Sequence, residues 1–202
     1  MMPRVLSYED PHAPSAVAAA LETGETMVFP TDTVYGIGGN PWDARTLGRV
    51  RALKGRPPDR PFALHLPTRA SIARYAVLDE RLQDLIGRLL PGPYTLLLSA
   101  TAQAPPSAVA AGKVGIRVPA HPFFQRTLAE LDRPLFGTSV NRHGEPPLLD
   151  IDAIIDRFGA VDLIVTGPTG LAASAILDLT THPPELLRGE LPIGLRSLLE
   201  EQ

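Results

Sequence analysis

The sequence predicts a single α/β domain built on a mixed sheet. Patterns typical of strands and of helices alternate along the 202 residues, but several neighbouring strands have no helix between them. No internal repeat, low-complexity tract or linker divides the chain, so we expect one domain over residues 1–202. A chain of this length can bury a full hydrophobic core. Its 44% hydrophobic and 20% charged content is that of an ordinary globular protein.

The first half of the chain shows clear starts and stops of helices. Pro14 opens a helix that Gly24 closes, and Asp43 is a suitable N-cap for a second helix that must end by Pro57. A short helix follows Thr68. Residues 79–90 place apolar side chains on one helical face, and the PGP sequence at 91–93 ends that helix. The strands expected in this half are 4–8, 27–29, 62–66 and 94–99.

The second half predicts further alternation. We expect strands at 114–118, 135–138, 161–165 and 175–179, and a short strand near Leu187. Helices are expected at 122–131, from Asp150 or Asp152 to Phe158, and from about Gly194. Residues 139–149 are expected to form a loop.

Residues 26–40, TMVFPTDTVYGIGGN, are the stretch around which the rest is organised. A short apolar strand ends at Pro30, and a loop rich in hydroxyls and glycine is expected to follow it to Gly39. Strand ends that open into such loops are where open α/β sheets bind ligands. The alternative is a plain connecting loop, which is common for this composition.

Composition excludes several classes of chemistry. With no cysteine there is no disulfide, thiolate nucleophile or Cys-ligated metal, and the five scattered histidines do not predict a protein-only metal site. The net charge of −3 argues against a protein that mainly grips nucleic acid. No apolar run is long enough to span a bilayer, and the N-terminus lacks the apolar core of a signal peptide, so we expect a cytoplasmic protein without membrane contact.

Three common catalytic or nucleotide motifs are missing. Lys54 precedes Gly55 instead of following a glycine, so the sequence has no Walker A motif. The glycines after residue 35 do not have the spacing of a dinucleotide-binding turn. Neither GTSVN at 137–141 nor AASAI at 172–176 forms a nucleophile elbow.

Basic and hydroxyl side chains at the ends of elements remain as candidates. Arg117 lies within the strand pattern GIRVP, where it either faces a cleft as a fork for carboxylate or phosphate or lies at an edge in solvent. Lys54 and Arg56 end a helix, where the dipole favours cations even without a ligand. His65 within a strand is either a ligand-binding or a hydrogen-bonded core histidine. The remaining candidates, each with a structural alternative as a turn or ion-pair residue, are Ser139, Asn141, Ser174 and Arg188.

The order of these segments resembles the YrdC/YciO family, whose best-known members are threonylcarbamoyl-AMP synthases. The segments that carry the resemblance are PTDTVYGIG (30–38), KGRPPDRPFALHL (54–66), LLPGPYTLLL (89–98), VGIRVP (114–119), SVN (139–141), SAILD (174–178) and LLRGEL (186–191). They span residues 14–191 approximately, and PTDTVYG followed at this distance by KGRP is highly specific. The length is similar to that of the single-domain form of the family.

The resemblance implies a YrdC-like fold, a twisted mixed sheet flanked by helices, with a large concave basic cleft. It implies an ATP-dependent nucleotidyltransferase that makes L-threonylcarbamoyl-AMP from L-threonine, bicarbonate and ATP, releasing pyrophosphate. The product would serve threonylcarbamoyladenosine modification of tRNA, completed by a separate transferase complex. Mg2+ would arrive with ATP and be held largely by phosphate and water.

The resemblance also implies a role for each candidate residue. Lys54 and Arg56 would be the catalytic cations, because positioning and positive charge supply most of the catalysis of such a transfer. The residues implied to bind threonine are Thr33, His65, Arg117 and Ser174. Those implied to bind ATP are Lys54, Arg56, Arg60, Ser139, Asn141 and Arg188. Thr31 and Tyr35 would shape the pocket.

Three segments depart from the family pattern. Arg60 replaces a common asparagine, and the SVN segment is followed by Arg142, His143 and Gly144 in place of Ser-Gly. Ala173 and Ala175 flank Ser174 where the family has Glu and Thr. These differences leave two alternatives open. One is a YciO-like paralogue that binds tRNA or double-stranded RNA, and the other is an adenylating enzyme with a different acceptor, for example carbamoyl phosphate.

Overall fold

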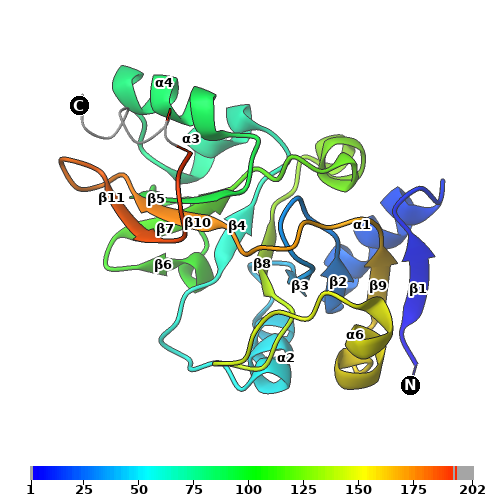
Figure 1. Ribbon diagram of the computed structural model, residues 1–202. Helices are drawn as coiled ribbons and strands as arrows, with labels where there is room; N and C mark the ends of the chain where they lie inside the picture. The colour runs from blue at the N-terminus through cyan, green and yellow to red at the C-terminus, as the bar shows by residue number, and fades with distance from the viewer. Residues whose placement is uncertain (1, 193, 195–202) are drawn as a thin grey trace.

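The computed structural model describes residues 2–192 and 194, and within them eleven strands form one mixed sheet (Figure 1). Ten of the strands follow the order β1-β9-β2-β3-β8-β4-β7-β5-β10-β11, and β6 pairs with β7 outside that path. The strands are β1 (Arg4–Ser7), β2 (Met27–Phe29), β3 (Gly36–Gly39), β4 (Ala63–His65), β5 (Tyr94–Ser99), β6 (Val109–Ala110), β7 (Lys113–Arg117), β8 (Leu135–Ser139), β9 (Leu163–Thr166), β10 (Ala175–Asp178) and β11 (Glu185–Arg188). Parallel pairs such as β4 and β7 alternate with antiparallel pairs such as β5 and β7, so the predicted mixed sheet is confirmed.

The helices divide between the two halves of the sheet. Those in the described part of the chain are α1 (Ala13–Thr23), α2 (Ala44–Lys54), α3 (Ile72–Tyr75), α4 (Glu80–Leu89), α5 (Ala129–Leu131) and α6 (Ile151–Phe158). Two short 3-10 helices lie at Arg69–Ser71 and Pro106–Ala108, and a π-helical turn at Phe124–Leu128 precedes α5. Asp43 caps α2 by accepting hydrogen bonds from the backbone N–H groups of Arg45 and Thr46, as the sequence predicts.

Helices cover both faces of the half of the sheet that contains β2, β3 and β9. Successive residues of β2 point to opposite faces: Val28 packs in a core with α2 and α6, whereas Met27 and Phe29 pack in another core with α1 and Phe124. In Figure 1, α2 and α6 accordingly lie on one side of these strands and α1 lies on the other. This half of the molecule is therefore a three-layer α/β sandwich.

In the described part of the chain, only one face of the half formed by β5, β7 and β10 carries helices. Leu96, Val114 and Leu177 form a third core with residues of α3 and α4. Figure 1 shows these two helices over one face of the strands. The alternate residues of the same strands, among them Thr95 and Lys113, point to the opposite face and line a cavity. The topology thus leaves one face of this half of the sheet open.

The expected loop after Pro30 contains a strand, which corrects the sequence prediction. Gly36–Gly39 forms β3, and it pairs antiparallel with both β2 and β8. Glycine is a poor strand former, but here the backbones approach too closely for a side chain. A Cβ at Gly38 would lie 1.8 Å from the carbonyl oxygen of Phe136.

The remaining predicted elements are observed within a few residues of their expected bounds. The helix expected from Gly194 lies outside the described residues. None of the helices in the described part is long and apolar enough to cross a membrane.

Candidate active site

A cavity of about 520 Å3 occupies the open face of β5, β7 and β10. Its other walls come from the segment after β2, the C-terminal end of α2, the residues before β4, and the loop after β8. The cavity brings together eleven of the twelve residues that the sequence singled out: Thr33, Tyr35, Lys54, Arg56, Arg60, His65, Arg117, Ser139, Asn141, Ser174 and Arg188. Thr31 is fully buried behind Thr33 and does not line the cavity.

We call the buried side of this cavity the inner wall, formed by Thr33, His65, Arg117 and Ser174. The Nη2 atom of Arg117 donates hydrogen bonds of 2.9 Å each to Asp32 Oδ1 and Thr33 Oγ1. Asp32 Oδ2 accepts a third hydrogen bond from the backbone N–H of Ala120 at 3.0 Å. These bonds hold Arg117 in one orientation. The residue is also buried, with only 7% of its surface exposed.

Burial also determines the charge state of the inner wall. Desolvation lowers the pKa of Arg117 to about 10, Asp32 opposes this shift, and Arg188 adds to it. Arg117 consequently remains a cation at neutral pH. Burial, together with the nearby charge of Arg117, holds the pKa of His65 well below its usual value, so its imidazole is neutral.

Two aromatic rings and the backbone of β8 pack against the ring of His65 and fix its position. The ring lies 5.7 Å from the ring of Phe29 and 5.9 Å from that of Phe124, measured between centroids. Gly137 of β8 passes directly behind it, and a Cβ there would lie 2.6 Å from Cε1 of the histidine. The glycine is therefore required to make room for the imidazole.

Ser174 joins the inner wall to the strand hairpin β10–β11. Its Oγ lies 2.8 Å from Thr95 Oγ1, and its carbonyl oxygen accepts hydrogen bonds from Nε and Nη2 of Arg188 at 3.2 and 2.9 Å. Nη2 of Arg188 also lies 3.3 Å from Ser174 Oγ. Much of the hydrogen-bonding capacity of the Ser174 hydroxyl is thus used within the protein.

Lys54 ties the end of α2 to the loop after β8. Its Nζ donates to the carbonyl oxygens of Ser139 and Asn141, the latter at 2.7 Å, and to Asn141 Oδ1 at 3.1 Å. Burial, assisted by the charge of Arg56, lowers the pKa of Lys54 to about 7. The ammonium group therefore organises this loop and titrates near neutral pH.

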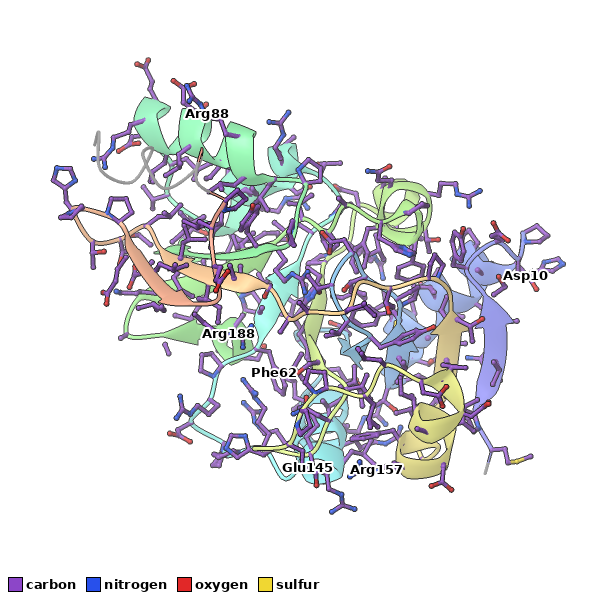
Figure 2. The ribbon with its side chains drawn as sticks, viewed as in Figure 1. Asp10, Phe62, Arg88, Glu145, Arg157 and Arg188 are labelled. Carbon is purple, nitrogen blue, oxygen red and sulfur yellow. The ribbon has the colours of Figure 1, made fainter. Side chains whose placement is uncertain are left out.

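The side chains of the same loop complete its fold. Nδ2 of Asn141 donates to the carbonyl oxygens of Arg142 and Glu145, both at 2.8 Å. Arg157 of α6 forms an ion pair of 2.6 Å with the Glu145 carboxylate (Figure 2). The asparagine is thus a loop-forming residue as well as a cavity residue.

We call the more accessible cations of the cavity the outer rim, formed by Arg56, Arg60, Lys113 and Arg188. Arg56 donates to the carbonyl oxygen of Pro61 at 2.7 Å, and its guanidinium lies 5.0 Å from the centre of the Phe62 ring. Phe62 and Arg188, both labelled in Figure 2, approach this cavity from the segment before β4 and from β11.

The basic residues of the cavity carry more positive charge than the carboxylates paired with them neutralise. Lys113 pairs with Asp178 at 2.6 Å and Arg117 pairs with Asp32. The other four basic lining residues, Lys54, Arg56, Arg60 and Arg188, have no carboxylate partner in the described part of the chain. Burial lowers the pKa of Arg56, where Arg51 and Arg60 act in the same direction, and of Arg188. Such a surplus of cations favours binding of an anion.

Sequence reasoning missed several residues of the site. Asp32 lies in the segment after Pro30 and was not selected, although it orients Arg117. Lys113, Thr95 and His143 line the cavity without having been selected. The alternation of β7, which places Lys113 on the same face as Arg117, could have identified the lysine.

The cavity does not supply a set of metal ligands. No group of three or more His, Asp or Glu side chains suited to a metal is found among residues 2–192 and 194. The lining residues offer hydroxyl, amide and imidazole groups but no carboxylate in the part of the chain that is described. A resident Mg2+ held by the protein alone does not fit these residues.

The fold and the cavity define an α/β protein whose cavity combines a fixed arginine with a surplus of cations, an arrangement suited to a small anionic ligand. The family model Sua5/YciO/YrdC, described as telomere recombination, matches residues 19–189, and the chain therefore belongs to this family. This confirms the resemblance drawn from its motifs.

Similar proteins agree in sequence and in structure. The threonylcarbamoyl-AMP synthase of Pyrococcus abyssi is 34% identical in an alignment of 186 residues that covers 87% of this chain and 54% of that protein. The chain thus spans about half the length of that relative. The crystal structure of P. abyssi Sua5 complexed with L-threonine has a TM-score of 0.83 at 29% identity, covering 98% of this chain and 61% of that one. E. coli YciO has a TM-score of 0.82 at 27% identity, covering 92% and 93% of the two chains. These matches confirm the expected YrdC-like fold.

Proposed function

We propose that the protein is an ATP-dependent nucleotidyltransferase that makes L-threonylcarbamoyl-AMP. The substrates are L-threonine, bicarbonate and ATP, and pyrophosphate and water are released. The observation that carries the proposal is the placement, within one cavity, of a buried, oriented arginine and four cations that lack carboxylate partners among the described residues. An amino acid carboxylate suits the first group, and a triphosphate suits the second.

The inner wall would hold threonine. Arg117 would pair with its carboxylate, and Thr33, His65 and Ser174 would contact the rest of the molecule. Two observations support this role. Arg117 remains charged at neutral pH. Asp32 and Thr33 occupy only its Nη2 atom, which leaves the other guanidinium nitrogens for a ligand.

The outer rim and the loop after β8 would hold ATP. Lys54 and Arg56 would be the catalytic cations, while Arg60, Ser139, Asn141 and Arg188 complete the nucleotide site. Thr31, behind the cavity, and Tyr35, which lines it, would shape the pocket, and the hydroxyl of Tyr35 is fixed by donating to the carbonyl oxygen of Gly167 at 2.6 Å.

The reaction would depend on positioning and charge. The threonine amine captures carbon dioxide or bicarbonate to give a carbamate, and a carbamate oxygen then attacks the α-phosphorus of ATP while the bond to pyrophosphate breaks. The cations offset the negative charge that otherwise repels the attack, so no protein nucleophile is needed. Mg2+ would enter bound to ATP, with phosphate and water as its ligands.

The product would be used in threonylcarbamoyladenosine modification of tRNA. A mixed anhydride of this kind is an activated acyl donor, so we propose transient contact with the tRNA threonylcarbamoyl transferase complex and a cytoplasmic location. Binding of tRNA by this chain itself is not needed for the reaction.

The test is pyrophosphate release by the purified protein. We expect release from ATP that requires both L-threonine and bicarbonate, and that falls to background in the double variant Lys54→Ala/Arg56→Ala. Release that does not depend on threonine, or that is unchanged in the double variant, would contradict the proposal. Mass spectrometry of the mixture should detect threonylcarbamoyl-AMP.

A second candidate is a YciO-like enzyme with another acceptor. It is favoured by the two alanines around Ser174 and by the existing bond between Ser174 Oγ and Thr95, which weaken recognition of a substrate hydroxyl. Replacing threonine by other amino acids or by carbamoyl phosphate in the same assay separates the two candidates. Salt-sensitive binding of tRNA or double-stranded RNA, without pyrophosphate release, would indicate an RNA-binding paralogue instead.

A further inference from the structure

The hydroxyl of Thr31 has no capacity left for a ligand. Its single proton is donated to the carbonyl oxygen of Val34 at 2.7 Å, because a carbonyl can only accept. Thr31 Oγ1 also accepts a hydrogen bond of 3.1 Å from the backbone N–H of Thr33 and lies 2.8 Å from Thr33 Oγ1. With its proton on Val34, Thr31 is the acceptor in this last contact.

The direction of the bond between the two threonines is thereby fixed. Thr33 must donate its own hydroxyl proton to Thr31, since Thr31 has none to give. On its other side, Thr33 Oγ1 accepts a hydrogen bond from Nη2 of Arg117 at 2.9 Å. A hydroxyl has one proton and two acceptor sites, so Thr33 retains one acceptor site and no proton.

Thr33 lines the cavity, whereas Thr31 lies behind it and is fully buried. A ligand beside Thr33 therefore meets an oxygen that can accept a hydrogen bond but cannot donate one. The guanidinium of Arg117, 2.9 Å from the same oxygen, can only donate. The site thus presents an acceptor and a donor side by side.

We propose that Thr31 is a positioning residue that makes Thr33 an obligate acceptor, and that the group Thr33 recognises is the ammonium of an α-amino acid whose carboxylate binds Arg117. The inference rests on the proposed function, which places the amino acid on the inner wall. The ammonium and carboxylate of an α-amino acid are both attached to the α carbon and so lie close together, as the neighbouring acceptor and donor require. A hydroxyl on the side chain is farther from the carboxylate.

The test compares L-threonine with 3-hydroxybutyrate, which keeps the carboxylate and the hydroxyl but lacks the amine. The dissociation constant of each ligand is measured by calorimetry, and the ratio of the two constants reports recognition of the ammonium alone. In the unaltered protein we expect threonine to bind more tightly. Thr31→Val removes the hydroxyl that accepts the Thr33 proton, so this proton becomes free. We expect the preference for threonine in this variant to fall on the order of tenfold, the effect of one hydrogen bond.

Thr31→Ser is the matched control, because it keeps the hydroxyl, and its preference should stay within about twofold of the unaltered protein on the same scale. Thr31→Val leaves the carbonyl of Val34 without a donor, so melting curves must accompany it. If that variant does not fold, Thr33→Val tests the same point by removing the acceptor itself, and Thr33→Ser is its control. A fall in preference is expected there too.

The outcomes separate the inference from the function on which it rests. If the unaltered protein binds threonine but Thr31→Val and Thr33→Val keep the full preference for it, the inference is overturned and the proposed site survives. If the unaltered protein binds neither ligand, the amino acid site is wrong and the inference falls with it.

Discussion

The two sides of the cavity differ in how their polar groups are held. On the inner wall, Thr33 and Arg117 are buried and each has at least two hydrogen-bond partners at fixed distances. On the outer rim, Arg60 and Arg188 are exposed, and neither has a carboxylate partner in the described chain, although Arg188 is hydrogen-bonded to Ser174. The inner wall lies where the three-layer half of the sheet meets the open half, whereas the rim belongs to strand ends and loops.

This difference separates two kinds of recognition. Buried groups with a fixed donor and acceptor pattern distinguish ligands by shape, since a mismatch leaves a buried polar group unpaired. Exposed cations attract charge over a distance, with little demand on geometry and with sensitivity to salt. We therefore expect substitutions on the inner wall to change selectivity and substitutions on the rim to change the general affinity for anions.

The largest effect is expected at Gly38, where the backbones of strands β3 and β8 approach each other closely. In Gly38→Ala the new Cβ would lie 1.8 Å from the carbonyl oxygen of Phe136, so strands β3 and β8 must separate. We expect a loss of about 3 kcal/mol or more in the free energy of unfolding. Gly48→Ala is the matched control, because a Cβ in that position of α2 meets nothing within 4 Å and should raise stability by about 0.5–1 kcal/mol. Equal stability of the two variants in denaturant titrations would contradict the close approach.

Arg117→Lys tests whether geometry or charge matters on the inner wall. Lysine keeps the positive charge but cannot contact Asp32, Thr33 and a ligand carboxylate with one planar group. We expect threonine to bind about 30-fold more weakly, a loss of about 2 kcal/mol, while the dissociation constant of ATP changes less than about threefold. Comparable losses for both ligands would break the distinction between the two sides.

Lys54 lies between the two sides, and its pKa of about 7 predicts pH-dependent binding of ATP. Above pH 7.5 the amine of the free protein is largely neutral, whereas bound phosphates favour the ammonium, so binding must take up a proton. Affinity should fall by up to about tenfold per pH unit from pH 7.5 to 9. Calorimetry in buffers of different ionisation enthalpy measures the proton uptake. Lys54→Arg remains charged throughout, and the same pH dependence in that variant would refute the assignment.

Arg60→Gln should have the smallest effect. An exposed cation contributes about 1 kcal/mol or less, so we expect roughly fivefold weaker ATP binding at low salt and no difference at high salt. Threonine binding should not change. Arg88→Gln is the control, because Arg88 is exposed on α4, away from the cavity (Figure 2). If Arg60→Gln weakened the binding of threonine and not that of ATP, this residue would act with the inner wall, contrary to our assignment of it to the outer rim.

The sequence predicted most elements because their signals are local. The caps and proline stops of α2 and α4 lie within the helices themselves or next to them, and the apolar run of β5 is self-evident. β3 was missed because three of its four residues are glycine, and the close approach that requires Gly38 comes from Phe136, a residue about a hundred positions away. Local propensity carries no information on such an approach.

The site shows the same limit. Motif order predicted which side chains line the cavity, but it did not reveal that Asp32 holds Arg117 across 85 positions of sequence. The direction of the bond between Thr31 and Thr33 likewise depends on the Val34 carbonyl and on Arg117, and it follows only from atomic positions. Partners across the sheet determine these features, and no alternation of residue types encodes them.

The pairing of the late strands has a consequence for synthesis of the protein. β9 lies between β1 and β2, and β10 lies beside β5, so the strands that complete the sheet leave the ribosome after residue 160. Ser174 directly precedes β10 and Arg188 ends β11, whereas Thr33 emerges early. Contacts of such long sequence separation form slowly and late in folding. A nascent chain that has displayed its PTDTVYG segment therefore still lacks one side of the cavity, and we expect unfinished chains to bind neither nucleotide nor amino acid.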